Sequence, residues 1–296
     1  MNGRFAPSPT SELHLGNLRT ALLAWFYARS AGEGFLVRNE DLDSTRVAAA
    51  SGVAERQLAD LAALGIDWDG EVVNQSDRFS LYRDASVRLE TYECFCTRKE
   101  IAAASSAPHG ELRPYAGTCR NLTEKEKVDL RKRRPASIRV HANSACFTVA
   151  DRFFGEITAE VDDFVLFRSD GNLSYNLAVV VDDGLQGVTQ VCRGRDLLES
   201  SPRQAWLATQ LGFPVPEYLH VGLVMKDGVR LAKRHGDISL RDISVTGMRR
   251  MINESLELPE DLAPIDWLTE STAQLLNSSS ITVDWNTTDH ESSQRS

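Results

Sequence analysis

The sequence predicts an α/β fold of the Rossmann type, in which a doubly wound parallel sheet carries an inserted subdomain and a short helical C-terminal stub. Residues 4–6 form a short strand candidate, the apolar positions after Gly16 have helical spacing, and residues 35–37 form a second strand candidate. Strand, helix and strand in close succession make a βαβ unit, which is the seed of a parallel sheet. The same alternation resumes after residue 160, so the segment before it is predicted to be an insertion.

Prolines and glycines set the limits of the first elements. Pro7 and Pro9 break the chain after the first strand, and Gly32 stands where a helix C-cap belongs. Residues 46–64 predict a second amphipathic helix that ends at the following glycine, and residues 77–90 predict a third. The apolar residues that define the first helix are Leu18, Ala21, Leu22, Trp25 and Ala28.

The later elements follow the insertion, in which only residues 123–133 have a helical pattern. Residues 164–168 and 173–181 predict two strands joined by a hairpin turn at residues 169–172. The other predicted elements are strands at 188–192 and 218–225, a helix between Pro202 and Gly212, and a helical stub at 247–258.

The predicted domains differ in charge. Residues 1–90 and 161–246 form the Rossmann-like domain, 91–160 the insertion, 247–268 the stub and 269–296 an acidic tail that we expect to be disordered. The net charge is −9, but residues 251–296 hold nine acids and one arginine, so the body is nearly neutral. A nucleic-acid partner would therefore need a local basic face. Arg131-Lys132-Arg133-Arg134 with Arg139 is one candidate, and a solvated charged loop is the alternative.

The apolar residues and the cysteines indicate the compartment in which the protein works. The chain has no run of about 18 apolar residues and no apolar N-terminal stretch suited to a signal peptide. We therefore expect a cytoplasmic protein without a membrane span. We also expect a monomer. The odd count of five cysteines argues against a disulfide framework, and Cys146 and Cys192 are expected to be buried apolar residues.

Two short segments predict a nucleotide site. Residues 7–17 lie between the first strand and the first helix, where ligands bind in open α/β sheets, and free N–H groups at the helix start suit a phosphate. His14 can donate a hydrogen bond to a phosphoryl oxygen, and Gly16 lets a nucleotide approach the backbone. Residues 230–236 form a basic loop in which Lys233 can stabilise charge during attack on the α-phosphate.

The two segments, in this order and at this separation, resemble the signatures of the class I aminoacyl-tRNA synthetases. His-Leu-Gly-Asn at residues 14–17 stands for a first signature that is usually His-Ile-Gly-His. Arg-Leu-Ala-Lys-Arg at residues 230–234 stands for a second that is usually Lys-Met-Ser-Lys-Ser, so Asn17, Ala232 and Arg234 depart from the common forms. The resemblance implies ATP with Mg²⁺ as a substrate, bound by His14, Gly16 and Lys233, and catalytic roles for His14, Gly16, Asn17 and Lys233.

Residues 4–10, 38–43, 175–183 and 191–197 resemble the glutamate-specific branch of that family. Arg4 and Arg193 can each make paired hydrogen bonds to a carboxylate, and Glu40 can hold an ammonium group. The resemblance places Arg193 at the substrate's side-chain carboxylate, where it would reject glutamine. The implied L-glutamate site comprises Arg4, Phe5, Ala6, Pro7, Ser8, Glu40, Tyr175 and Arg193.

Cys94, Cys96 and Cys119, with Tyr115, form the cysteine cluster of the insertion. Three thiolates and one further ligand make a closed structural zinc site, although the spacing alone leaves reduced, unliganded thiols equally open. The short paralogues of the glutamate branch, the glutamyl-queuosine tRNA(Asp) synthetases, carry this pattern with its tyrosine. The resemblance therefore implies one structural Zn²⁺ held by Cys94, Cys96, Tyr115 and Cys119 in a zinc-containing, acceptor-side insertion.

The predicted fold ends near residue 268, without the C-terminal body that would reach an anticodon in a long relative. The resemblance to the short paralogues implies that glutamate is activated without tRNA and transferred to queuosine at the wobble position of tRNA(Asp). A single-stranded anticodon loop offers splayed bases that a pocket can bind. Two alternatives stay open: a glutamate-activating ligase with a non-RNA acceptor, and a degenerate, non-catalytic RNA-binding relative.

Overall fold

The computed structural model describes residues 1–97, 99–101, 115–226, 229–230, 238–269, 276, 282 and 284–286. Its main sheet has seven strands in the order β3-β2-β1-β9-β10-β6-β7. The parallel part consists of β3 (Val73–Asn74), β2 (Gly34–Asn39), β1 (Asn2–Phe5), β9 (Val188–Gly194) and β10 (Glu217–Val221). Successive strands are added on one side of β1 up to β3 and on its other side from β9 onward. This order confirms the predicted doubly wound α/β fold.

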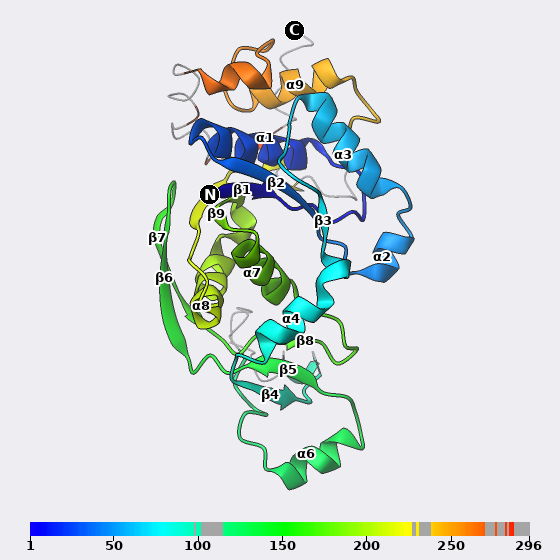
Figure 1. The fold of residues 1–296 in the computed structure, drawn as a ribbon, viewed down its shortest axis with the longest axis vertical. Helices are drawn as coiled ribbons and strands as arrows, with labels where there is room; N and C mark the ends of the chain where they lie inside the picture. The colour runs from blue at the N-terminus through cyan, green and yellow to red at the C-terminus, as the bar shows by residue number, and fades with distance from the viewer. Residues whose placement is uncertain are drawn as a thin grey trace.

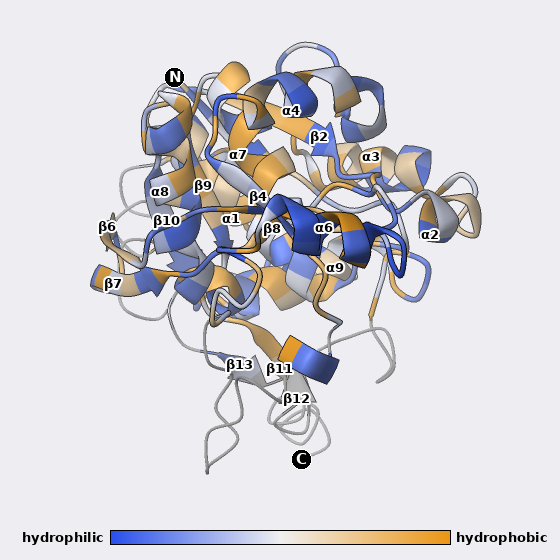
Figure 2. Ribbon diagram, turned by 90° about the horizontal axis from the view of Figure 1, so that it is seen from below, coloured by the Kyte–Doolittle hydropathy of each residue, from blue (hydrophilic) through white to orange (hydrophobic). Residues whose placement is uncertain are grey.

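Helices cover both faces of this sheet (Figure 1). On one face lie α1 (Leu15–Ser30), α3 (Val53–Leu64) and α9 (Val245–Glu254), and on the other lie α4 (Phe79–Ser86), α7 (Tyr175–Leu185) and α8 (Ser201–Leu211). Hydrophobic residues gather along α1, α7 and β9 in the middle of the molecule (Figure 2). Among the described residues, no helix has both the length and the hydropathy needed to cross a membrane.

Helix α1 forms where the proline-broken loop ends. His14 is its N-cap, and Asn17 completes a capping box by accepting the His14 N–H through Oδ1 at 3.3 Å. The helix is buried around most of its circumference, which places it at the centre of the larger core. It ends before Gly32, whose φ of +70° is the left-handed conformation that glycine adopts readily.

The insertion is smaller than its predicted span of 91–160. A three-stranded sheet joins β4 (Thr91–Cys94), β5 (Ser137–Val140) and β8 (Val165–Phe167), and α6 (Glu124–Arg131) matches the predicted helix. However, β6 (Ala145–Asp151) and β7 (Gly155–Val161) extend the main sheet, since Asp151 pairs with Tyr218 of β10. Strand pairing thus crosses the predicted boundary at residue 160, which local sequence pattern does not reveal.

Four predicted elements differ from the structure. The predicted strand 173–181 is helix α7, whose cap Ser174 accepts the Leu177 N–H at 3.5 Å. An apolar run buried on all sides has the same periodicity in a strand and in a helix. Two further predicted elements are divided: Gly52, with φ +72°, separates α2 (Ser44–Ala48) from α3, and residues 222–223 separate β10 from β11 (Val224–Lys226). The predicted helix 77–90 is shorter, with η1 (Gln75–Arg78) leading into α4.

The C-terminal residues that the structure describes pack on the core. After α9 and η3 (Pro264–Leu268), the fully buried Leu276 accepts a hydrogen bond from Tyr27 Oη at 2.6 Å. Strand β13 (Trp285–Asn286) pairs in parallel with β11, which also pairs with β12 (Val229–Arg230). The predicted disorder of 269–296 is therefore wrong at these positions, because apolar residues scattered in a polar segment find places in the core.

Candidate active site

The first signature lies in a pocket of about 160 Å³ at the carboxyl ends of β1, β9 and β10. Its walls include His14, Gly16, Asn17 and Phe5. His14 Nδ1 accepts the Gly16 N–H at 3.1 Å, so the neutral ring carries its proton on Nε2. A Cβ on Gly16 would come within 3.1 Å of the His14 ring, which explains the glycine at this position. The structure thus groups the predicted residues of the first signature in one pocket.

The start of α1 differs from the prediction of open backbone donors. The Leu15 N–H donates to Ile238 O at 2.8 Å, and the Gly16 N–H is used by His14. Lys233 and the rest of residues 231–237 lie outside the described residues. Within the described part of the pocket, an anion would therefore meet the helix dipole and the His14 ring.

A second pocket, of about 360 Å³, lies at the carboxyl end of β2, the strand that pairs with β1. Three of the residues predicted to bind glutamate, Ser8, Glu40 and Tyr175, line it, while the predicted Phe5 lines the first pocket. Pro7 contributes its carbonyl, which accepts the Glu40 N–H at 2.9 Å and joins the ends of β1 and β2. Ala6, between Phe5 and Pro7, shows no polar role beyond its place in the loop.

Behind this pocket lies a buried charged cluster, of which only Arg4 and Glu40 were predicted as site residues. Arg4 donates to the two carboxylate oxygens of Asp183 at 3.4 Å each, and Arg38 donates to Asp183 Oδ1 at 2.8 Å. Arg38 also lies 3.6 Å from Glu40 and 3.7 Å from Asp182. Two adjacent acids inside an apolar run, and an arginine inside a buried strand, were the signals of this cluster in the sequence.

The cluster shifts the pKa values of its acids in opposite directions. Burial alone would raise the pKa of Asp183, but Arg4 and Arg38 hold it below its usual range. Burial raises the pKa of Glu40 to about 7, and the two arginines offset only part of that rise. Glu40 therefore lacks a full counter-charge, as expected of a carboxylate whose partner is a cationic ligand.

Arg193 is held by a second buried network. Its Nε donates to His220 Nε2 at 2.9 Å, and His220 Nδ1 lies 2.7 Å from Asp151 Oδ2. Its Nη1 donates to Gln204 at 2.6 Å, and its Nη2 donates to Ser201 Oγ at 2.8 Å and to Leu197 O at 3.3 Å. A guanidinium has five N–H donors, so about one is left for a ligand. The predicted paired hydrogen bonds from Arg193 to a carboxylate are thus reduced to a single one.

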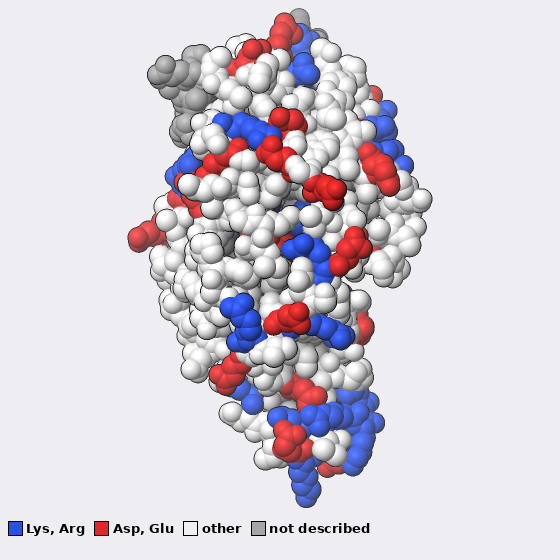
Figure 3. All heavy atoms as spheres, in the orientation of Figure 1, with Lys and Arg blue, Asp and Glu red and all other residues white. Residues whose placement is uncertain are grey.

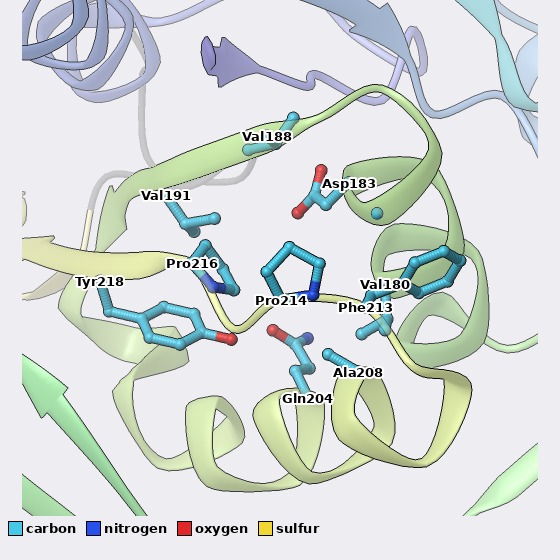
Figure 4. A pocket seen from close by; sticks show the side chains of 11 residues that line it. Val180, Asp183, Val188, Val191, Gln204, Ala208, Phe213, Pro214, Pro216 and Tyr218 are labelled. Atoms are coloured by element: carbon cyan, nitrogen blue, oxygen red, sulfur yellow. The ribbon is translucent and has the colours of Figure 1, made fainter. Parts of the chain in front are cut away.

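Four of the predicted glutamate residues nevertheless share one electrostatic neighbourhood. Tyr175 is 40% exposed at the pocket, and its hydroxyl lies within the electrostatic reach of Glu40, Arg193 and Arg4. Between α7, α8 and β9, Asp183, Gln204 and Tyr218 face an enclosed cavity of about 10 Å³ (Figure 4). That volume is about one water molecule, so this cavity is no site for an amino acid.

The cysteine cluster of the insertion has the dimensions of a tetrahedral metal site. The Sγ atoms of Cys94, Cys96 and Cys119 lie within 4.8 Å of one another, with Cys96 and Cys119 at 3.5 Å. Tyr115 Oη lies 3.3 Å from Cys94 Sγ and 3.7 Å from Cys96 Sγ. Four ligands on Zn²⁺ would be separated by about 3.5–3.8 Å, as follows from tetrahedral geometry and Zn–S bonds of about 2.3 Å. The three cysteines therefore fit a zinc site.

Two predictions near the insertion are wrong. Cys146 is exposed, because it lies on an outward-facing position of β6, whereas Cys192 is buried as predicted. Arg139 is not part of a basic surface, since it is buried, donates to Asp163 O at 2.6 Å and stacks 3.8 Å from the Tyr115 ring centre.

Lysines and arginines gather at the end of the molecule that holds α6 (Figure 3). Several of these cations pair with nearby acids: Arg131 with Glu93 at 2.5 Å, Lys132 with Asp129 at 2.8 Å, and Arg134 with Glu100 at 2.9 Å. This pairing favours the interpretation of residues 131–134 as a solvated charged surface.

Comparison with known proteins identifies the family of this chain. The family model of the class I tRNA synthetases (E and Q), catalytic domain, matches residues 1–286. The chain belongs to this family. It is 53% identical over 268 residues to a glutamyl-Q tRNA(Asp) synthetase of Nocardia farcinica, covering 87% of this chain and 85% of that one. It is 55% identical over 269 residues to a glutamyl-Q tRNA(Asp) synthetase of Cutibacterium acnes, covering 88% and 78%.

The fold of the family extends to solved structures. A glutamate tRNA ligase from Elizabethkingia meningosepticum superimposes with a TM-score of 0.77 and 23% identity, over 97% of this chain and 66% of that one. At this identity the likeness concerns the fold alone. The first signature follows β1 of the parallel sheet, at the edge where open α/β sheets bind their ligands.

Proposed function

We propose that the protein activates L-glutamate with ATP and Mg²⁺, without tRNA, to glutamyl-adenylate and pyrophosphate. It then transfers glutamate to queuosine at the wobble position of tRNA(Asp). The observation that carries this proposal is the 53–55% identity, over most of the chain, to relatives named glutamyl-Q tRNA(Asp) synthetase. We retain the inference of a cytoplasmic monomer from the sequence.

The two neighbouring pockets support the adenylation step. ATP would occupy the pocket of His14, Gly16 and Asn17, where the protonated Nε2 of His14 can donate to a phosphoryl oxygen as charge builds. Glutamate would occupy the pocket of Ser8, Glu40 and Tyr175. The substrate carboxylate would then be presented to the α-phosphate across the end of β1. From the second signature, Lys233 would stabilise the pyrophosphate leaving group.

The charged residues behind the amino-acid pocket would select the substrate. Glu40 would bind the ammonium group, and Arg4, fixed by Asp183, would attract the α-carboxylate. The remaining Nη1–H of Arg193 would bind the side-chain carboxylate, whereas glutamine would present an uncharged amide there.

Glutamate binding should weaken at mildly acidic pH. Glu40 has a pKa raised to about 7 by burial, and the substrate's ammonium group requires its ionised form. Below pH 7, where Glu40 binds a proton in the free protein, the KM for glutamate should rise by about tenfold per pH unit. The measurement is glutamate-dependent ATP–pyrophosphate exchange from pH 5.5 to 8. Glu40→Gln, which cannot titrate, should show weak binding and a flat profile, and a flat wild-type profile would contradict the role of Glu40.

We also infer that Cys94, Cys96, Tyr115 and Cys119 hold one structural Zn²⁺. The Tyr115 hydroxyl lies within 3.7 Å of two of the cysteine sulfurs and accepts the Cys119 N–H at 3.0 Å, which supports its assignment as the fourth ligand. The ion would stabilise the insertion by joining β4 to the segment before α6. Metal analysis of the purified protein should find one zinc per chain, and Cys96→Ser should lower that content; a protein without zinc would refute the assignment.

The proposed function is tested by two assays on the full chain. Glutamate-dependent exchange of pyrophosphate into ATP should proceed in the absence of tRNA, and its absence with or without tRNA would indicate a non-catalytic relative. Labelled glutamate should then be transferred to tRNA(Asp) that contains queuosine and not to the unmodified tRNA. Exchange without transfer to any tRNA would indicate a non-RNA acceptor, and charging of tRNA(Glu) at its 3′ end would indicate ordinary aminoacylation.

A further inference from the structure

Asp284, from the C-terminal segment, makes hydrogen bonds to two walls of the proposed nucleotide pocket. The two walls are formed by Leu223, at the start of β11, and by Gly194, Asp196 and Leu197, at the start of η2 (Arg195–Ser200). Asp284 lies across both walls. Its Oδ1 accepts the Leu223 N–H at 2.7 Å, and its Oδ2 accepts from Arg195 Nη2 at 2.6 Å.

Residues that do not line the pocket bind the backbone of Gly222 and Leu223 in its wall. The Trp285 N–H donates to Leu223 O at 2.9 Å, so the adjacent residues Asp284 and Trp285 satisfy both backbone groups of Leu223. The Gly222 carbonyl accepts from Nη1 of the buried Arg19 at 2.7 Å, and Arg19 Nε donates to Ser255 at the end of α9. The C-terminal part of the chain therefore fixes the backbone of this wall.

The same strand pairing extends to Arg230, the first residue of the second signature. Strand β13 pairs with β11 at Val224–Trp285 and Met225–Asn286, and β11 pairs with β12. Along the chain, Lys233 follows Arg230, the last residue of β12, by three positions. The C-terminal segment thus pairs with the base of the hairpin that leads into that signature.

We propose that Asp284 is a positioning residue for ATP: by tying Leu223 to Arg195, it holds the two walls of the nucleotide pocket at the spacing that ATP requires. This inference rests on the proposed function, since it assigns the pocket to ATP. Asp284 lies beyond the residues that carry the family signatures and touches the pocket only through its wall residues. It acts on nucleotide affinity and leaves the glutamate pocket, which is lined by other segments, unchanged.

Variants of Asp284 separate its two contacts. Asp284→Asn retains an oxygen for the Leu223 N–H and loses the charge pair with Arg195, whereas Asp284→Ala loses both. We expect the Kd for Mg–ATP, measured by calorimetry on the full chain, to rise about threefold in Asp284→Asn and about tenfold or more in Asp284→Ala. Asp261→Asn, at an exposed C-terminal acid, is the matched control and should leave the Kd unchanged.

The outcomes separate this inference from the proposed function. The KM for glutamate in the exchange assay should stay within about twofold in all three variants. An unchanged Kd for Mg–ATP in Asp284→Ala would overturn the positioning role, and so would equal losses of ATP and glutamate affinity, which indicate general destabilisation. If the wild type binds Mg–ATP but catalyses no exchange, the proposed function fails while the Kd series still decides the role of Asp284. If the wild type binds no Mg–ATP, both fail.

Discussion

Replacement of Arg193 by lysine should raise the KM for glutamate by about 100-fold and leave the KM for ATP nearly unchanged. The guanidinium fits four acceptors at once, including His220 Nε2 and Gln204 Oε1. A lysine ammonium has three donors at one point and cannot reach acceptors placed around a planar fork. The loss of one charge-assisted hydrogen bond to the substrate is worth about 1.5–3 kcal/mol, or about 10- to 150-fold, and the expected factor lies near the upper end because Arg193 is buried. The measurement is the exchange assay with each substrate varied in turn.

Two substitutions of His220 test whether it orients Arg193 through a hydrogen bond or only packs against it. His220 is fully buried, and burial lowers its pKa, so it is neutral and its Nε2 accepts from Arg193 while Nδ1–H donates to Asp151. His220→Gln keeps an acceptor opposite Arg193 Nε and should raise the KM for glutamate much less than His220→Leu. If Arg193→Lys folds normally and retains the wild-type KM for glutamate, Arg193 does not contact the substrate carboxylate.

The parts of the fold that the sequence predicted have local causes. Pro7 and Pro9 end the first strand, and Gly32 ends α1, so the βαβ unit follows from neighbours in the chain. Helix α7 was predicted as a strand because its core-facing and sheet-facing sides are both apolar. Its correct assignment depends on the cap at Ser174 and on packing against α8, which residue spacing does not encode.

In the candidate site too, residues in recognisable local segments were predicted, whereas residues that depend on distant partners were not. Ser8, Glu40 and Tyr175 were predicted from segments that resemble a family, and the structure brings them to one pocket. Arg38 and His220 were missed, because their partners lie far away in the chain: Asp183 is 145 residues from Arg38, and Asp151 is 69 residues from His220. A buried charge can be recognised only when its counter-charge is known, and that knowledge requires the fold.

Replacement of Asp182 is expected to cause the largest loss of stability, because every hydrogen-bond partner of its carboxylate is a donor. Gln75 Nε2 and Tyr82 Oη donate to Oδ2 at 2.9 and 2.8 Å, and Arg78 Nε donates to Oδ1 at 2.7 Å. Asp182→Asn keeps the shape but turns one acceptor into a donor that faces another donor. Since Asp182 is fully buried, we expect a loss of about 3–5 kcal/mol in the free energy of unfolding, measured by urea denaturation.

The control for Asp182 is an acid whose ion pair lies at the surface. Asp129 pairs with Lys132 at 2.8 Å, with about half of its side chain exposed, and Asp129→Asn should cost less than about 1 kcal/mol. The contrast between the two variants measures what burial adds to the same chemical change. A loss at Asp182 no larger than that at Asp129 would mean that water reaches the Asp182 carboxylate. Asp182 would then not join α7 to the η1–α4 segment, and Arg38, which lies behind the amino-acid pocket, would depend on its contacts with Asp183 and Gln186.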